Sequence, residues 1–185
     1  MGVTNPTADK YPLSLRILHW VRALVILGLI ACGLTMTRLP ENHLSDVLYA
    51  NHKQFGILVW LLALVHLALR WRYRTVLPHS PEALTGWEKW LSHAVHRAIM
   101  ALVLLIPLLG YSMSSSFTQS DGVPFFFGQL PELLPKNDHA FVVFQALHKY
   151  SAYLLLALVA LHAAGAAKHR LLDKGGATDV LPRML

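Results

Sequence analysis

Four long apolar stretches determine what this chain can fold into. They lie in a sequence of 185 residues near 17–37, 55–71, 94–113 and 141–167. A stretch of about 17 to 25 mostly apolar residues is long enough to cross a bilayer as an α-helix. Only 14% of the residues are charged, whereas roughly a quarter are charged in an ordinary soluble domain. We therefore predict an all-α fold, in which residues 1–185 form a single membrane domain, an integral four-helix bundle with helices near 17–37, 52–71, 93–113 and 141–168.

Positive charge is concentrated at one end of the predicted bundle. The end that holds both termini carries most of the cations: Lys10, Arg16, Arg70, Arg72, Arg74, Lys89, Arg97, Lys168, Arg170, Lys174 and Arg183. The other end carries only Arg38, Lys53, Lys136 and Lys149. Because loops rich in Lys and Arg stay on the cytoplasmic side, we predict that both termini are cytoplasmic. Topology then explains the net charge of +6, and we expect no nucleic-acid partner.

The connections are expected to be loops. We place 38–51 and the longer 114–140 on the outer face, and 75–86 on the cytoplasmic face. The longest connection contains the aromatic run Phe125–Phe127, and we expect it to fold onto the bundle and shape an outer site. The predicted loops also contain histidines that we expect to be solvated: His43, His79 and His139.

Histidines inside the apolar stretches are the most informative residues, because a polar side chain in lipid usually serves a function. His148 and His162 lie fourteen residues apart in the last stretch. On an α-helix this separation is about 21 Å along the axis, and the two side chains share nearly one face. Imidazole is a standard axial ligand of haem iron, and bundles build cofactor sites from facing helices. The spacing therefore predicts one helix that carries a ligand for each of two stacked haems.

Depth in the membrane suggests the partners of these two histidines. His52, near the start of the second predicted helix, lies at the same outer side as His148, so we pair these two. The inner side is more crowded, since four histidines have a suitable depth to pair with His162: His19, His66, His93 and His96. His66 is a direct rival of His19, because His52 and His66 are also fourteen residues apart.

Small residues one helical turn after a histidine favour His19. A porphyrin that lies against a helix needs a small residue there, because a bulky side chain would meet the ring. The histidines with such a residue are His19, His52, His148 and His162, followed by Ala23, Gly56, Ala152 and Ala166. The others are His66, His93 and His96, followed by Arg70, Arg97 and Met100. Small residues also serve helix–helix contacts in lipid, which is the alternative explanation of the pattern.

Several short motifs resemble those of the bacterial cytochrome b561 family. They are Arg16-Ile17-Leu18-His19-Trp20, His52-Lys53-Gln54-Phe55-Gly56, Ile106-Pro107-Leu108-Leu109-Gly110, Leu147-His148-Lys149 and Ala160-Leu161-His162-Ala163. The similarity covers nearly the whole chain, and the family consists of four-helix, dihaem proteins of the inner membrane. The resemblance implies that His19 and His162 ligate the iron of a cytoplasmic haem b, and that His52 and His148 ligate that of an outer haem b. One departure is His66, which stands where the family pattern leads us to expect an arginine.

The resemblance also implies electron transfer. A bis-histidine haem has no open iron position and passes single electrons at its edge, and without a C-x-x-C-H motif it is held non-covalently. We expect an oxidoreductase that oxidises superoxide and reduces ubiquinone, like the superoxide oxidase of this family. The alternative is an electron-transfer subunit, which relays electrons between a docked dehydrogenase or hydrogenase partner protein and the quinone pool.

Secondary roles are expected for polar residues near the predicted ligands. Lys53 and Lys149 directly follow the outer histidines, where they would steer an anionic substrate or contact haem propionates. Arg22, one turn deeper than His19, would snorkel or meet a cofactor carboxylate. Proton relay to a quinone is a possible role for three histidines near the inner interface: His66, His93 and His96.

Overall fold

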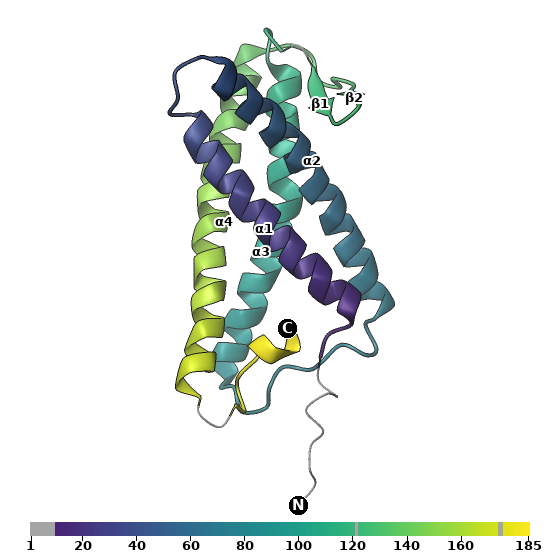
Figure 1. The fold of residues 1–185 in the computed structure, drawn as a ribbon, viewed down its shortest axis with the longest axis vertical. Coiled ribbons are helices and arrows are strands. Elements are labelled where there is room, and N and C mark those ends of the chain that lie inside the picture. Colours follow the sequence, from purple (N-terminus) through teal and green to yellow (C-terminus); the bar gives the residue numbers. More distant parts are fainter. Residues whose placement is uncertain (1–9, 121, 174–175) are drawn as a thin grey trace, which may run out of the picture.

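A computed structural model describes residues 10–120, 122–173 and 176–185, and these ranges contain four long helices (Figure 1): α1 Leu13–Met36, α2 His43–Arg72, α3 Gly86–Ser116 and α4 Asp138–Leu172. Each helix is long and apolar enough to cross a membrane. Large apolar side chains on all four helices are exposed, which is what lipid-facing surfaces require. The predicted all-α membrane bundle is confirmed.

The two ends of the bundle differ in charge and structure. We call the end where α2 and α4 finish the basic end, and the other the hairpin end. The two described chain ends both lie at the basic end, where Lys10 Nζ donates to the Leu185 carbonyl at 3.4 Å. That this end faces the cytoplasm stays a prediction. Lys174 of the basic set lies outside the described residues.

Helix α2 begins earlier than the sequence analysis predicted. Residues 43–51 are too polar to signal a spanning helix, so they were assigned to a loop, which is wrong. A capping box starts the helix: Asn42 Oδ1 accepts from the backbone N–H groups of Leu44 and Ser45, and Ser45 Oγ accepts from Asn42 N–H at 3.1 Å. His43 therefore lies in the first turn of α2 and His139 in that of α4, not in loops, although both are exposed.

A small β-hairpin in the connection between α3 and α4 packs on α2. Strand β1, Val123–Phe125, pairs antiparallel with β2, Gly128–Leu130, and Phe126 at the turn has a positive φ of 48°. Its backbone N–H donates to Gln54 Oε1 at 2.8 Å, and its ring contacts Phe55 with centroids 5.9 Å apart. The prediction that this connection folds onto the bundle is confirmed.

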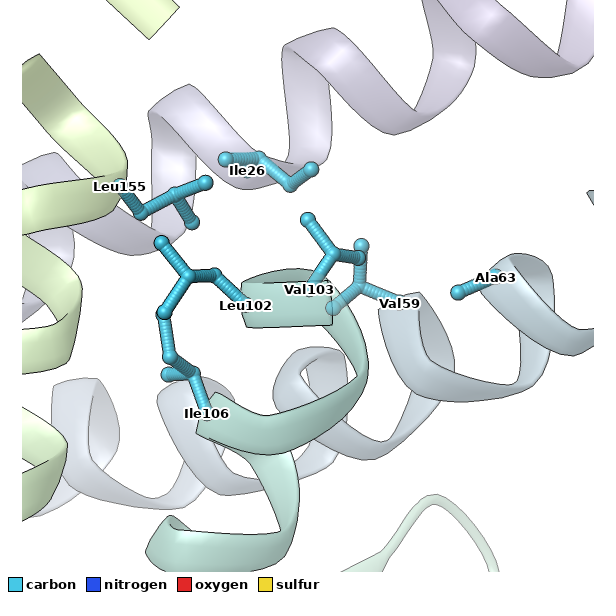
Figure 2. Packing of buried hydrophobic residues seen from close by; sticks show 7 residues of the cluster. All are labelled: Ile26, Val59, Ala63, Leu102, Val103, Ile106 and Leu155. Atoms are coloured by element: carbon cyan, nitrogen blue, oxygen red, sulfur yellow. The ribbon is translucent and has the colours of Figure 1, made fainter. Parts of the chain in front are cut away.

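The buried core consists of residues from all four helices (Figure 2): Ile26, Val59, Ala63, Leu102, Val103, Ile106 and Leu155. Leu155 stands seven residues from both His148 and His162, about 10 Å from each along the α4 axis. The core is therefore an apolar layer between an upper and a lower level of histidines.

The C-terminal residues fold back under the basic end. A short 3₁₀ turn, η1 Leu181–Arg183, lies near the start of α1 (Figure 1). Trp20 Nε1 donates to the Met184 carbonyl at 2.8 Å, and Tyr11 N–H donates to the Arg183 carbonyl at 3.1 Å. The last residues thus tie the first turns of α1 to the base of the bundle.

Candidate functional site

The hairpin end brings together His52 of α2 and His148 of α4. Their ring centroids lie 6.0 Å apart and their planes make an angle of 73°. The two helices run on opposite sides of the bundle axis, so the rings meet between them rather than on the lipid-facing surface. We call these two residues the hairpin-end pair.

Each ring of the hairpin-end pair lies against a glycine of a neighbouring helix. A Cβ added at Gly33 of α1 would lie 3.2 Å from His52 Cε1. A Cβ added at Gly110 of α3 would lie 3.1 Å from both Cε1 and Nδ1 of His148. These distances are tighter than most real Cβ contacts, so an alanine at either position would require the neighbouring imidazole to shift by a few tenths of an ångström.

The hydrogen bonds of this pair suit a metal ligand. His148 Nδ1 lies 3.0 Å from the Ile106 carbonyl oxygen. A carbonyl only accepts, so Nδ1 carries the proton and the lone pair of Nε2 stays available, as is usual for a metal-bound histidine. His52 Nδ1 is buried and makes no hydrogen bond of normal geometry among the described residues, although the backbone of Leu29 acts on this ring as an acceptor. Each ring therefore has a nitrogen that the polypeptide leaves unused.

The basic end brings together His19 of α1 and His162 of α4. Their ring centroids are 6.2 Å apart with an interplanar angle of 68°. His96 of α3 contacts the same His162 ring at 4.7 Å, edge to face. Among residues 10–120, 122–173 and 176–185 the rings in contact with His162 are those of His19 and His96, not His66. We call His19 and His162 the basic-end pair.

Both pairs fit an axially ligated haem. Two imidazoles that share one metal through nitrogen–metal bonds of about 2 Å have ring centroids roughly 6 Å apart, which is close to both observed distances. No group of three or more His, Cys, Asp or Glu side chains converges among the described residues. A porphyrin supplies four nitrogen ligands itself, so a histidine pair completes its iron.

Space for an apolar group is present beside the hairpin-end pair. A cavity of about 340 Å³ between α1 and α2 has a largely apolar lining: Leu24, Val25, Gly28, Leu29, Cys32, Asn51, His52 and Phe55. Its volume is within the range of small-molecule and cofactor sites. A Cβ at Gly56, the small residue one turn after His52, would meet nothing within 4 Å. The cavity borders His52 but not His148, so the donor chemistry of the pair, more than this space, fits a haem at this end.

The family described as prokaryotic cytochrome b561 matches this chain over residues 10–185. The chain belongs to this family. It is also similar to "Cytochrome b561 homolog 2" of Escherichia coli (strain K12), with 29% identity in an alignment 192 positions long that covers 100% of this chain and 95% of the relative. This cytochrome is therefore a multi-pass electron-transfer protein of the inner membrane that uses haem b, as the motifs predicted.

The two lysines expected to act beside the hairpin-end pair differ in their surroundings. Lys149 is exposed on α4, whereas Lys53 is partly buried and acts electrostatically on Glu132. A hydrogen bond from Lys136, more than the charge of Lys53, holds the pKa of the Glu132 carboxyl below its usual range. Glu132 thus offsets the charge of two of the cations at this end of the cytochrome.

His93 and His96 belong to neither of the two histidine pairs. His93 is exposed, with Nε2 3.2 Å from Ser80 Oγ, and His96 Nδ1 lies 2.6 Å from the Ser92 carbonyl. Sequence reasoning missed Gly33, Gly110 and the Ile106 carbonyl as supports of the hairpin-end pair. The motif from Ile106 to Gly110 contained two of these supports, but which histidine each residue faces depends on the rotation of the helices.

Proposed function

We propose that this cytochrome holds two b-type haems non-covalently, one between His52 and His148 and the other between His19 and His162. One observation carries the proposal: two histidine pairs with nearly equal ring spacing lie at two depths, separated by an apolar core. A bound bis-histidine haem exchanges one electron at a time at its edge and leaves no iron position open to oxygen.

The polypeptide contributes position and surroundings to such sites. Ile106 fixes the tautomer and orientation of His148, and Gly33 and Gly110 keep both hairpin-end rings upright between the helices. The apolar layer around Leu155 keeps water from the space between the two levels. These features favour outer-sphere electron transfer over chemistry at the iron.

We further propose that the overall reaction oxidises superoxide and reduces ubiquinone. Two superoxide anions each lose one electron to become oxygen, and one ubiquinone takes up both electrons and two protons to become ubiquinol. Lys149 and Lys53 support superoxide as the electron donor. Each directly follows a residue of the hairpin-end pair and places positive charge where an anion would approach.

A second candidate is an electron-relay subunit that serves a docked redox partner. One observation favours it: Glu132 lies among the hairpin-end cations and pairs with Lys136, which weakens the attraction for a small anion. In that case the electron donor is a protein that contacts the hairpin end, and quinone remains the other redox partner.

The test combines cofactor content with a superoxide pulse. Purified protein should contain close to two haems per chain by pyridine haemochrome, and superoxide should reduce them before added ubiquinone reoxidises them. The rate should fall as salt is raised, because the Debye length is only about 10 Å at 0.1 M. A Lys53→Gln/Lys149→Gln variant should start slower and respond less to salt.

A matched control removes two lysines from the basic end, Lys10→Gln/Lys89→Gln, and should leave the rate unchanged. A haem content near one per chain would refute the two-haem proposal. Full haem content with no reduction by superoxide would refute the oxidase and leave the relay subunit as the better account.

A further inference from the structure

Arg22 of α1 is buried inside the bundle at the basic end. Its residue surface is 6% exposed, although it lies in a helix that crosses the membrane. One guanidinium nitrogen, Nη2, lies 3.9 Å from Met100 Sδ, which is a weak acceptor. Its Nε is buried without a hydrogen-bond partner in the part of the chain that the structure describes. The guanidinium therefore points into the bundle with donors to spare.

Among the described residues, no carboxylate forms an ion pair with Arg22. The apolar stretches 17–37, 55–71, 94–113 and 141–167 contain no Asp or Glu at all. The ion pairs of residues 10–120, 122–173 and 176–185 join carboxylates to other cations: Lys136, Lys168, His169 and Arg170. None of these carboxylates pairs with Arg22. A buried cation without an anion is among the most costly features of a membrane protein. An anion from outside the polypeptide would remove this cost.

His66 of α2 provides a second unused donor at the same place. It is 7% exposed, and its Nδ1 is buried with no partner among the described residues. Arg22, Arg70 and His19 act on it electrostatically, so His66 lies near the buried arginine and His19. Arg22 of α1 and His66 of α2 thus each have an unused buried nitrogen, and both act electrostatically on the surroundings of His19.

We propose that Arg22 and His66 bind a propionate carboxylate of the haem held by His19 and His162. The inference rests on the proposed function, since that haem brings the anion. A carboxylate fits better than a quinone oxygen, because a neutral carbonyl would accept the hydrogen bonds but would not balance the buried charge. His66 then acts as a positioning residue for the cofactor and not as an iron ligand.

The test compares haem b with its dimethyl ester, which keeps the porphyrin and iron but has no carboxylates. Apoprotein is titrated with each compound, and binding at the two sites is separated with His52→Ala and His19→Ala proteins. In the wild-type background the ester should bind the basic-end site more weakly than haem b by on the order of tenfold to a hundredfold. In Arg22→Met the ratio of the dissociation constant of the ester to that of haem b should fall close to one. In His66→Leu this ratio should fall part of the way.

Arg97→Met is the matched control, because Arg97 is an exposed arginine of α3. It should keep the wild-type ratio, and Arg22→Lys should keep part of it if Arg22→Met fails to fold. A lower reduction potential of the basic-end haem in Arg22→Met is the second readout, since a buried positive charge near the iron is lost. Retention of the hairpin-end haem shows that each variant is folded.

Two failures are distinguishable. If the wild type binds only one haem, the proposed function itself fails. If it binds two haems but the ratio of ester to haem b is the same in Arg22→Met and wild type, only the propionate inference is overturned. An Arg22→Met variant that changes quinone reoxidation but not this ratio would also overturn it, in favour of a quinone partner.

Discussion

The hairpin-end and basic-end histidine pairs have almost the same ring spacing but opposite surroundings. At the hairpin end, backbone defines the site: two glycines border the rings, and the Ile106 carbonyl accepts from His148. At the basic end, polar side chains define it: His96 contacts His162, while Arg22 and His66 approach His19. The hairpin-end pair is bordered closely by backbone, and the basic-end pair is surrounded by polar side chains.

As proposed haem ligands, the two pairs would therefore be tuned by different means. A site held by backbone contacts depends on shape, so added volume should damage it most. A site surrounded by cations and hydrogen-bond donors depends on charge, so neutral substitutions should change its potential and affinity. The predictions below test this difference, and the one with the largest expected effect comes first.

Removal of a predicted ligand should remove one haem and leave the other. His148→Ala or His52→Ala should lose the hairpin-end haem, whereas His66→Ala should retain both at saturating haem, because its ring does not contact His162. Haem content and reduced absorption spectra measure this. Loss of a haem in His66→Ala together with retention of both haems in His19→Ala would mean that His66, and not His19, is the partner of His162.

Added volume should damage the hairpin-end site alone. In Gly110→Ala the new Cβ would lie 3.1 Å from a ring that is already hydrogen-bonded, so His148 must tilt away from its position. Loss of a second-shell support typically costs about ten- to a hundredfold in affinity, and we expect this for the hairpin-end haem. Haem titration measures it, with Gly86→Ala as control because no atom lies within 4 Å of that Cβ. An equal loss of haem affinity at both ends would contradict a local effect of Gly110→Ala on His148.

Release of the C-terminal residues should loosen the basic end. Trp20→Phe keeps a ring beside His19 but loses the 2.8 Å hydrogen bond to the Met184 carbonyl, which is worth about 1 kcal/mol. Thermal loss of the basic-end haem spectrum should begin earlier, while the hairpin-end spectrum should hold. Trp90→Phe, at an exposed ring stacked on Trp87, is the control. An equal shift for both haems would mean that the contact supports the whole bundle.

The smallest effect is expected from Glu132→Gln. The variant removes the negative charge near Lys53 and Lys136, so the rate of reduction by superoxide should rise by less than about fivefold and depend more steeply on salt. Glu41→Gln, in the other connection at this end, should change the rate less. A slower rate in Glu132→Gln would mean that Glu132 mainly orders the loop.

The pH dependence of the same ion pair has a defined sign. Because the folded pKa of Glu132 is lowered, its pair with Lys136 stabilises the loop above the ordinary carboxyl pKa of about 4.3, and this contribution is lost as pH falls through the lower folded value. The thermal stability of the wild type should therefore approach that of Glu132→Gln only in acid. A difference between the two proteins that persists there would contradict the assignment.

Much of the architecture could be predicted from local sequence. Apolar stretches of spanning length specify the four helices, and the fourteen-residue separation in α4 specifies two levels of histidines, because both depend only on helix rise and hydropathy. The early start of α2 was missed because hydropathy has no information about the Asn42–Ser45 capping box. The same holds for the β-hairpin, whose strands are only three residues long.

Which of His19 and His66 comes into ring contact with His162 was decided by tertiary structure, although its role as an iron ligand stays a prediction. Both have suitable depth, and only the rotation of α1 and α2 about their axes brings one of them to His162. Packing also decided that Gly33 and Gly110 border the rings and that Arg22 points inward, since these contacts join residues far apart in the chain. A sequence specifies what each helix can present, but the face that meets a neighbour is set by the mutual packing of all four.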